Sequence, residues 1–171
     1  MKKALPETRL NNSIDEAFTH LKRLLYAGGK IKDFVPLKEK CMDEIGDEKI
    51  GYIDQFIFRF MKLQDCMGMR VFPALLEYLQ EDYRKKPFLD IIHRLEQLGV
   101  IENAFDWQQL RELRNSLAHE YPENKEENME ALNLLFNKTP VLLGILRTST
   151  RYAGKTLDKV FPDVPEFSFR F

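Results

Sequence analysis

The sequence predicts an all-α protein: an antiparallel bundle of about five to six helices with an irregular C-terminal tail. Apolar residues recur every three or four positions over most of the chain, as they do along one face of an α-helix. Alternating runs of β-branched residues and Asn-Gly hairpin turns, which would indicate strands, are almost absent. The joins between the expected helices are short, and short joins favour antiparallel neighbours.

The first expected helix begins near Ser13. This residue is followed three positions later by Glu16, and the two form the pattern of a capping box. An apolar stripe then continues as far as the pair Gly28 and Gly29. We expect the helix to end at these glycines, because glycine commonly terminates helices.

Two further helices are expected in the first half of the chain. One runs over about residues 36–45, where a glycine interrupts it. The other starts near Tyr52 and continues past Gly68 to about Leu79. We expect Pro73 to kink this helix, because an interior proline removes one backbone hydrogen bond and clashes with the preceding turn.

The second half contains a short helix over residues 88–98, closed by Gly99, and a second over about residues 103–120. A last long helix starts near Glu123. The tail from residue 154 onward cannot be regular helix, because it contains two closely spaced prolines. Its aromatic side chains predict that it packs on the body of the protein or on a partner.

Length and composition predict one domain over residues 1–171. The chain is 44% hydrophobic, which is enough for a single core at this length. We expect the helical core to span roughly residues 10–150, with the C-terminal extension over about residues 154–171.

The charge balance limits the kinds of partner. Lys and Arg number 26 and Asp and Glu number 27, so the formal net charge is −1. Non-specific affinity for nucleic acid requires many side chains that neutralise phosphates. The sequence therefore argues against a broad basic surface, and no DNA partner is expected. A small local site that acts on RNA is still compatible with this balance.

The two cysteines, Cys41 and Cys66, have no CxxC spacing and no neighbouring histidine cluster. They fit neither a zinc site nor a disulfide-rich secreted scaffold, so we expect no metal, no cofactor and a reducing cytoplasmic location. No apolar run follows the two lysines at the start of the chain, and no stretch approaches the ~18 apolar residues of a membrane span. No membrane partner is expected.

The segment 111–122 carries the strongest functional signal. Within eight positions it contains a guanidinium (Arg114), an imidazole (His119) and a phenol (Tyr121), at the end of a helix that Pro122 stops. Such a group can hold a phosphate, move a proton near neutral pH and offer a hydroxyl for reaction or modification.

The spacing of these residues has a geometric consequence. In an ideal helix Arg114 and Tyr121 lie about 20° apart, on one face, whereas Arg114 and His119 lie about 140° apart. Asn115 and His119 are an i,i+4 pair, so the amide of Asn115 can orient the imidazole. Arg114 and His119 meet around one substrate if the last turn unwinds ahead of Pro122. A symmetric dimer is the other route, because the segment then enters one cleft from both subunits.

This chemistry suits cleavage of a phosphodiester without a metal. His119 would move protons to or from the ribose 2′-hydroxyl or the leaving oxygen, and Arg114 would neutralise charge on the phosphate. A purely structural role must be weighed against it. Arginine and histidine near a helix C-terminus also complement the helix dipole, and from chemistry alone that reading is the more common one.

The residues Arg114 to Tyr121 resemble the R-x4-H-x-Y signature of the HEPN superfamily, and most closely the HepT-like toxins that pair with a minimal nucleotidyltransferase antitoxin. The stretch 53–65 also resembles the upstream helix of that family. With the all-helical layout, the resemblance covers roughly residues 10–150.

The resemblance implies a function. Arg114 and His119 would be the catalytic pair of a metal-independent endoribonuclease, with a composite active site in a homodimer and RNA as the substrate. Tyr121 would receive AMP from the partner nucleotidyltransferase, and this would inactivate the toxin, since the added phosphate competes for the site beside Arg114. The acidic run 123–130 adjoins Tyr121 and would repel RNA nearby.

Two alternatives are left open. The protein could be a non-catalytic subunit that presents a nucleotide or substrate to a separate nucleotidyltransferase, with Arg114 as its phosphate clamp. It could also be a helical adaptor whose motif is only helix-end chemistry. Outside the motif, His20 is expected to be solvated or half-buried, Trp107 to be buried, and Asp65 carries no predicted role.

Overall fold

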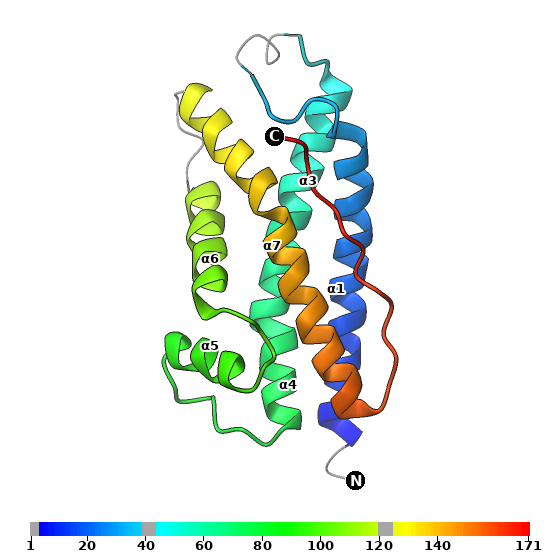
Figure 1. The fold of residues 1–171 in the computed structure, drawn as a ribbon, viewed down its shortest axis with the longest axis vertical. Helices are drawn as coiled ribbons and strands as arrows, with labels where there is room; N and C mark the ends of the chain where they lie inside the picture. The colour runs from blue at the N-terminus through cyan, green and yellow to red at the C-terminus, as the bar shows by residue number, and fades with distance from the viewer. Residues whose placement is uncertain (1–3, 39–43, 120–124) are drawn as a thin grey trace.

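The computed structural model describes residues 4–38, 44–119 and 125–171, with side chains omitted at 118–119 and 125–128 (Figure 1). All regular elements in these ranges are helical, which confirms the all-α bundle. In chain order they are α1 (Ala4–Ile31), α3 (Asp47–Cys66), the π-helix η1 (Met67–Val71), α4 (Phe72–Tyr78), α5 (Phe88–Gln97), α6 (Ala104–His119) and α7 (Lys125–Leu157).

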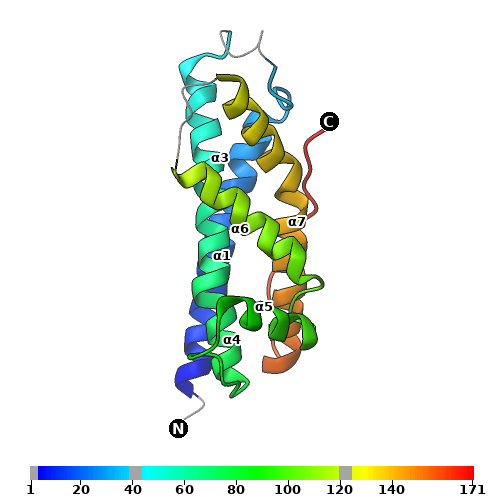
Figure 2. The same cartoon turned by 90° about the vertical axis from the view of Figure 1, so that its left-hand side faces the viewer.

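The long helices α1, α3 and α7 lie side by side, and the shorter α5 and α6 cover one side of them (Figures 1 and 2). Helices α1 and α3 run antiparallel and form the most extensive helix pair. Their buried faces meet those of α6 and α7 in one core. Its largest fully buried side chains include five aromatic ones, Trp107, Phe56, Phe60, Phe72 and Phe136.

Helix α1 is longer at both ends than its sequence pattern predicts. It begins at Ala4, so the capping box at Ser13 and Glu16 is wrong. Ser13 lies inside the helix, where its hydroxyl donates to the carbonyl of Arg9 at 2.7 Å, a bond that satisfies serine within a helix. At the other end the helix continues through Gly28 and Gly29, because the apolar face continues to the buried Ile31.

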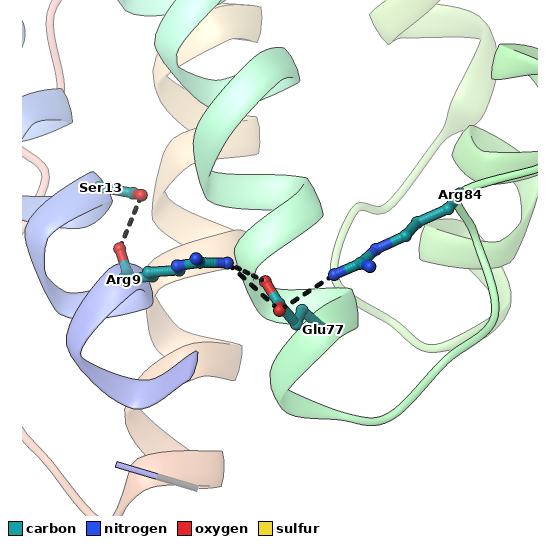
Figure 3. Close-up of polar contacts among 4 residues, drawn as sticks. All are labelled: Arg9, Ser13, Glu77 and Arg84. Carbon is teal, nitrogen blue, oxygen red and sulfur yellow. Dashed lines mark hydrogen bonds and ion pairs between the residues drawn. The ribbon is translucent and has the colours of Figure 1, made fainter. Parts of the chain in front are cut away.

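A polar cluster ties the start of α1 to the end of α4 (Figure 3). The carboxylate of Glu77 accepts from Arg9 of α1 at 3.2 Å, and from Arg84 of the following loop at 3.2 Å. Both arginine side chains are more than half exposed, so each ion pair contributes little to stability. The cluster links the surface of α1 to that of α4 and of the loop that follows it.

The helix expected over residues 36–45 is absent at 36–38 and at 44–45, and residues 39–43 lie outside the described ranges. The side chain of Asn133 explains the first part. Its Oδ1 accepts from the backbone N–H of Leu37 at 2.7 Å, and its Nδ2 donates to the carbonyl of Leu37 at 3.0 Å. Both backbone groups of this buried leucine are therefore used in pairing with α7 rather than in a helix.

The chain continues past Gly68 as predicted, but the irregularity lies just ahead of Pro73. It is the π-helix η1, in which the N–H of Phe72 donates to the carbonyl of Met67, five residues back. Helix α4 follows directly, with Pro73 in its first turn, a position where the missing N–H costs little.

The later helices agree with their sequence patterns. Helix α5 ends two residues before Gly99, which adopts a positive φ of 75°. The side chain of Asn103 accepts from the N–H of Phe105 at 2.8 Å at the start of α6. The start of α7 expected at Glu123 lies outside the described residues. At its other end α7 continues to Leu157, so the expectation of no regular helix from residue 154 onward is wrong for 154–157, because the two prolines of the tail lie further on.

The C-terminal tail packs on the body of the protein, which is one of the two outcomes that its aromatic content predicts. It turns back at the end of α7 and runs beside α1 (Figure 1). Phe169 is buried, with ring centroids 5.3 Å from Phe56 and 4.9 Å from Phe136. Arg147 of α7 donates to the tail carbonyl of Val164 at 3.1 Å.

Candidate functional site

Helix α6 carries the motif, and Trp107 anchors it to the body. This side chain is buried, as predicted, and its ring meets that of Phe72 edge to face with centroids 4.8 Å apart. It also lies over Gly68 in η1, where an added Cβ would come within 3.1 Å of the indole. The absence of a side chain at Gly68 therefore allows α6 to approach η1 closely.

This anchor sets the direction of Arg114. Residues seven apart lie about 20° apart around a helix, so Arg114 is on the same side of α6 as Trp107, about 10 Å further along. Helix α6 crosses α3 obliquely (Figure 2). Arg114 therefore reaches the last turn of α3, where its Nη2 donates to Oδ2 of Asp65 at 3.0 Å.

The guanidinium of Arg114 is oriented and partly accessible. The side chains of Arg114 and Asp65 are 29% and 30% exposed. Nη1 of Arg114 also donates to Oδ1 of Asn115 at 3.3 Å, while its buried Nε has no hydrogen-bond partner among the described residues. An anion at this site would meet the terminal nitrogens of a guanidinium that one carboxylate already holds in place.

Arg114 and Arg111, the two arginines of the segment 111–122, contact different helices. Arg111 stacks on the ring of Phe88 in α5, with its guanidinium carbon 3.9 Å from the ring centroid. Ser116 donates to the carbonyl of Leu113 within α6 at 2.8 Å. Of Arg111, Arg114 and Ser116, only Arg114 forms a hydrogen bond with α3 among the described residues.

His119 is the last residue of α6, and its side chain is outside the described set, as is the whole of Tyr121. The structure thus brings Arg114 and Asn115 together, whereas the orientation of His119 by Asn115 stays a prediction. The backbone of α6 is helical through His119, so no unwinding precedes this residue. A face shared by Arg114 and Tyr121 also stays a prediction.

Asp65 is the member of the site that sequence reasoning missed. It lies 49 positions from Arg114, on a different helix, so no local spacing connects the two. The only available signal was that Asp65 is one of several charged residues on an amphipathic helix. That signal does not select a partner.

A second polar cluster lies between α1 and α3. Nη1 of Arg59 is 3.1 Å from Nδ1 of His20, so Nδ1 accepts and the imidazole is neutral. Burial, then the charge of Arg59, lowers the pKa of His20 below its ordinary value. The His20 side chain is 13% exposed, as expected for a half-buried histidine. Burial and the like charge of Arg23 lower the pKa of Arg59.

The described residues contain no group of three or more His, Cys, Asp or Glu side chains arranged to hold a metal ion. No helix within the described ranges has a stretch sufficiently long and apolar to cross a membrane. A comparison of the chain with protein-family models, with curated proteins and with solved structures found no match.

Proposed function

We propose that this protein is an endoribonuclease toxin that cleaves RNA with Arg114 and His119 and without a metal ion. One observation carries the proposal beyond the sequence motif. The guanidinium of Arg114, five residues before the end of α6, is held at 3.0 Å by Asp65 and is partly open to solvent. An oriented guanidinium that acts together with a histidine is a suitable combination for phosphodiester cleavage.

In the proposed reaction the ribose 2′-oxygen attacks the adjacent phosphorus. The bond from phosphorus to the 2′-oxygen forms as the bond to the leaving 5′-oxygen breaks, which gives a cyclic phosphate and a free 5′-hydroxyl. His119 removes the 2′ proton or protonates the leaving oxygen, which is worth about 10²–10⁴-fold in rate. Arg114 neutralises the charge that develops on the phosphate, and Asp65 keeps its guanidinium in position.

The proposal includes a homodimer. The backbone of α6 is helical through His119, and positions 114 and 119 of an ideal helix lie about 140° apart. A symmetric dimer resolves this, because His119 of one subunit can then face Arg114 of the other. The proposed regulator is a minimal nucleotidyltransferase that transfers AMP to Tyr121. The added phosphate would compete with RNA for Arg114.

Cleavage of RNA by the purified protein in the presence of EDTA tests the proposal. His119→Ala should reduce the rate at least about 100-fold, and Arg114→Ala should also abolish cleavage. The matched control is Arg111→Ala, because this arginine stacks on Phe88 and should leave cleavage intact. A His119→Ala protein that cleaves RNA as fast as the unchanged protein would overturn the catalytic assignment.

Two other outcomes identify the alternatives. A protein that never cleaves RNA, but binds a nucleotide in a manner that Arg114→Ala abolishes, would be a non-catalytic subunit of a separate nucleotidyltransferase. If Arg114→Ala changes only stability, the protein is a helical adaptor. The proposed modification is tested by intact mass after co-expression with a nucleotidyltransferase: one added AMP is expected, and none in Tyr121→Phe.

A further inference from the structure

An exposed aromatic ring on α3 lies beneath two cations. The side chain of Phe58 is 49% exposed. The guanidinium carbon of Arg59 is 5.1 Å from its ring centroid, and Nζ of Lys62 is 5.6 Å from it. An exposed aromatic ring flanked by cations can stack with a planar ligand while the cations contact the charged groups of that ligand.

The cations around this ring are not neutralised by acids. No ion pair among the described residues includes Arg59, Lys62 or the nearby Arg23 of α1. Arg59 instead contacts His20, and its buried Nε has no partner within the described part of the chain. By contrast, Arg70 on the same side of the bundle is paired with Glu16 at 2.5 Å.

A second aromatic and cationic group continues along the same two helices. Nζ of Lys30 is 5.4 Å from the ring centroid of Tyr26 and 5.9 Å from that of Tyr52. Tyr26 is 55% exposed, and its ring meets that of Tyr52 edge to face with centroids 6.1 Å apart. Tyr52 and Arg59 are seven residues apart on α3, and therefore on one side of that helix.

We name these residues the α1–α3 stripe. It consists of Arg23, Tyr26 and Lys30 of α1 with Tyr52, Phe58, Arg59 and Lys62 of α3.

The stripe leads to the candidate functional site. Phe58 and Asp65 are seven residues apart on α3, so they lie about 20° apart around the helix and about 10 Å apart along it. Asp65 holds Arg114. A chain-like ligand that lies on Phe58 is therefore directed toward the guanidinium of Arg114.

We propose that the α1–α3 stripe binds single-stranded RNA, with a base stacked on Phe58 and the flanking phosphates held by Arg23, Arg59 and Lys62. Alternating rings and cations are the features that bind single strands, because unpaired bases expose their faces and phosphates follow at regular intervals. The inference rests on the proposed function in one respect: the RNA bound at the stripe is taken to be the substrate that is cleaved beside Arg114.

Charge favours RNA over a second copy of the chain on this face. In a two-fold symmetric contact the same patch meets itself, so the unpaired cations of both copies would be brought together. Juxtaposed like charges oppose association, whereas a polyanion complements them. The net charge of −1 does not conflict with this, because the stripe is local.

The test measures binding separately from cleavage. The full chain carrying His119→Ala is titrated into a fluorescein-labelled oligouridine, and the anisotropy is measured. Phe58→Ala added to this protein should weaken binding by about fivefold or more, and Phe58→Trp should restore it. The matched control is Phe105→Ala, because Phe105 is 60% exposed on α6 and, among the described residues, no cation lies over its ring.

The phosphate contacts are tested by salt. Lys62→Ala and Arg23→Ala should each lower the slope of log affinity against log salt by about 0.7. An RNA duplex of the same length should bind more weakly than the single strand, because its bases cannot stack on Phe58. Equal affinity for the duplex would overturn the single-strand assignment.

The outcomes distinguish this inference from the proposed function. If the unchanged protein does not cleave RNA but binds it through Phe58, the proposed function fails and the inference stands. If RNA is cleaved but Phe58→Ala leaves binding unchanged, the inference is overturned and the proposed function stands. If Phe58→Ala dissociates a dimer in sedimentation without changing RNA affinity, the stripe is a self-association surface and the inference is also overturned.

Discussion

Arg114 and Asp65 join α6 to the end of α3 through a hydrogen bond of 3.0 Å between Nη2 and Oδ2. Both side chains are less than one third exposed, so this ion pair is better shielded than the arginine pairs of Glu77. It also uses a guanidinium whose Nε is buried. We therefore expect the pair to contribute to the position of α6 as well as to ligand binding.

A double-mutant cycle measures this contribution. Arg114→Ala and Asp65→Ala should each lower the free energy of unfolding, and the double variant should lose less than the sum by about 1 kcal/mol, because the second change removes a partner that is already missing. Urea unfolding provides the measurement. Arg111→Ala combined with Asp65→Ala is the control and should be additive within about 0.5 kcal/mol. Additivity in the Arg114 cycle would show that the pair contributes nothing to stability.

The adjacent glycines of α1 should respond to alanine in opposite directions. An added Cβ at Gly28 would lie 2.6 Å from Cζ of Phe167, whereas one at Gly29 meets nothing within 4 Å. Gly29→Ala should raise the free energy of unfolding by about 0.5–1 kcal/mol through helix propensity. Gly28→Ala should lower it by about 1–3 kcal/mol, because the tail ring is displaced. Thermal or urea unfolding of both variants checks the signs.

A second substitution in the tail tests the cause of the stability loss expected in Gly28→Ala. In a Phe167→Ala background part of the cost of Gly28→Ala should disappear, because the closest contact, at 2.6 Å, is gone while Cε2 of Phe56 remains at 3.0 Å. If the cost is unchanged, the contact between the tail and α1 is not its cause.

His20 should make stability depend on pH. Burial and Arg59 lower its pKa below the ordinary value of 6.5, so below that pH the unfolded chain binds more protons than the folded protein. The free energy of unfolding should therefore fall as the pH falls below 6.5. His20→Gln should remove this component. The difference between the two proteins, measured by urea unfolding from pH 8 to pH 5, should change with pH, and a constant difference would contradict the assignment.

Cys66 should be unreactive in the folded protein. Burial is the main cause that raises the pKa of its thiol to about 12, with Glu16 adding to the effect and Arg70 opposing it. At pH 8 about one thiol in 10⁴ is then a thiolate, which is the form that alkylating reagents attack. Peptide mass spectrometry after iodoacetamide should detect modified Cys66 only when urea is present. Rapid labelling without urea would show that the α1–α3 interface opens readily.

Periodicity was sufficient where a helix is defined by its own sequence. Helix α5 follows its apolar pattern and ends just before Gly99, which has the positive φ that glycine favours. The apolar periodicity gave wrong helix boundaries where contacts with residues distant in sequence determine the conformation. Gly28 continues the helix that it was expected to end, and Leu37 is held in a non-helical conformation by Asn133, 96 positions away.

The candidate site shows the same division. Arg114 was predicted because the R-x4-H-x-Y spacing is local and selects it over Arg111, but the spacing does not say what either arginine contacts. Those contacts are with Phe88 on one side and Asp65 on the other, and both belong to other helices. Sequence spacing describes one helix at a time, so it contains no information on which neighbour a side chain meets.

The tail has a consequence for how the protein is made. Phe169 packs against both Phe56 and Phe136, which precede it in the chain. A ribosome adds residues in order from the N-terminus, so these two rings lack this cover until the tail has been synthesised. Docking of the tail is therefore a late event in folding, and until it occurs the uncovered rings are available to chaperones.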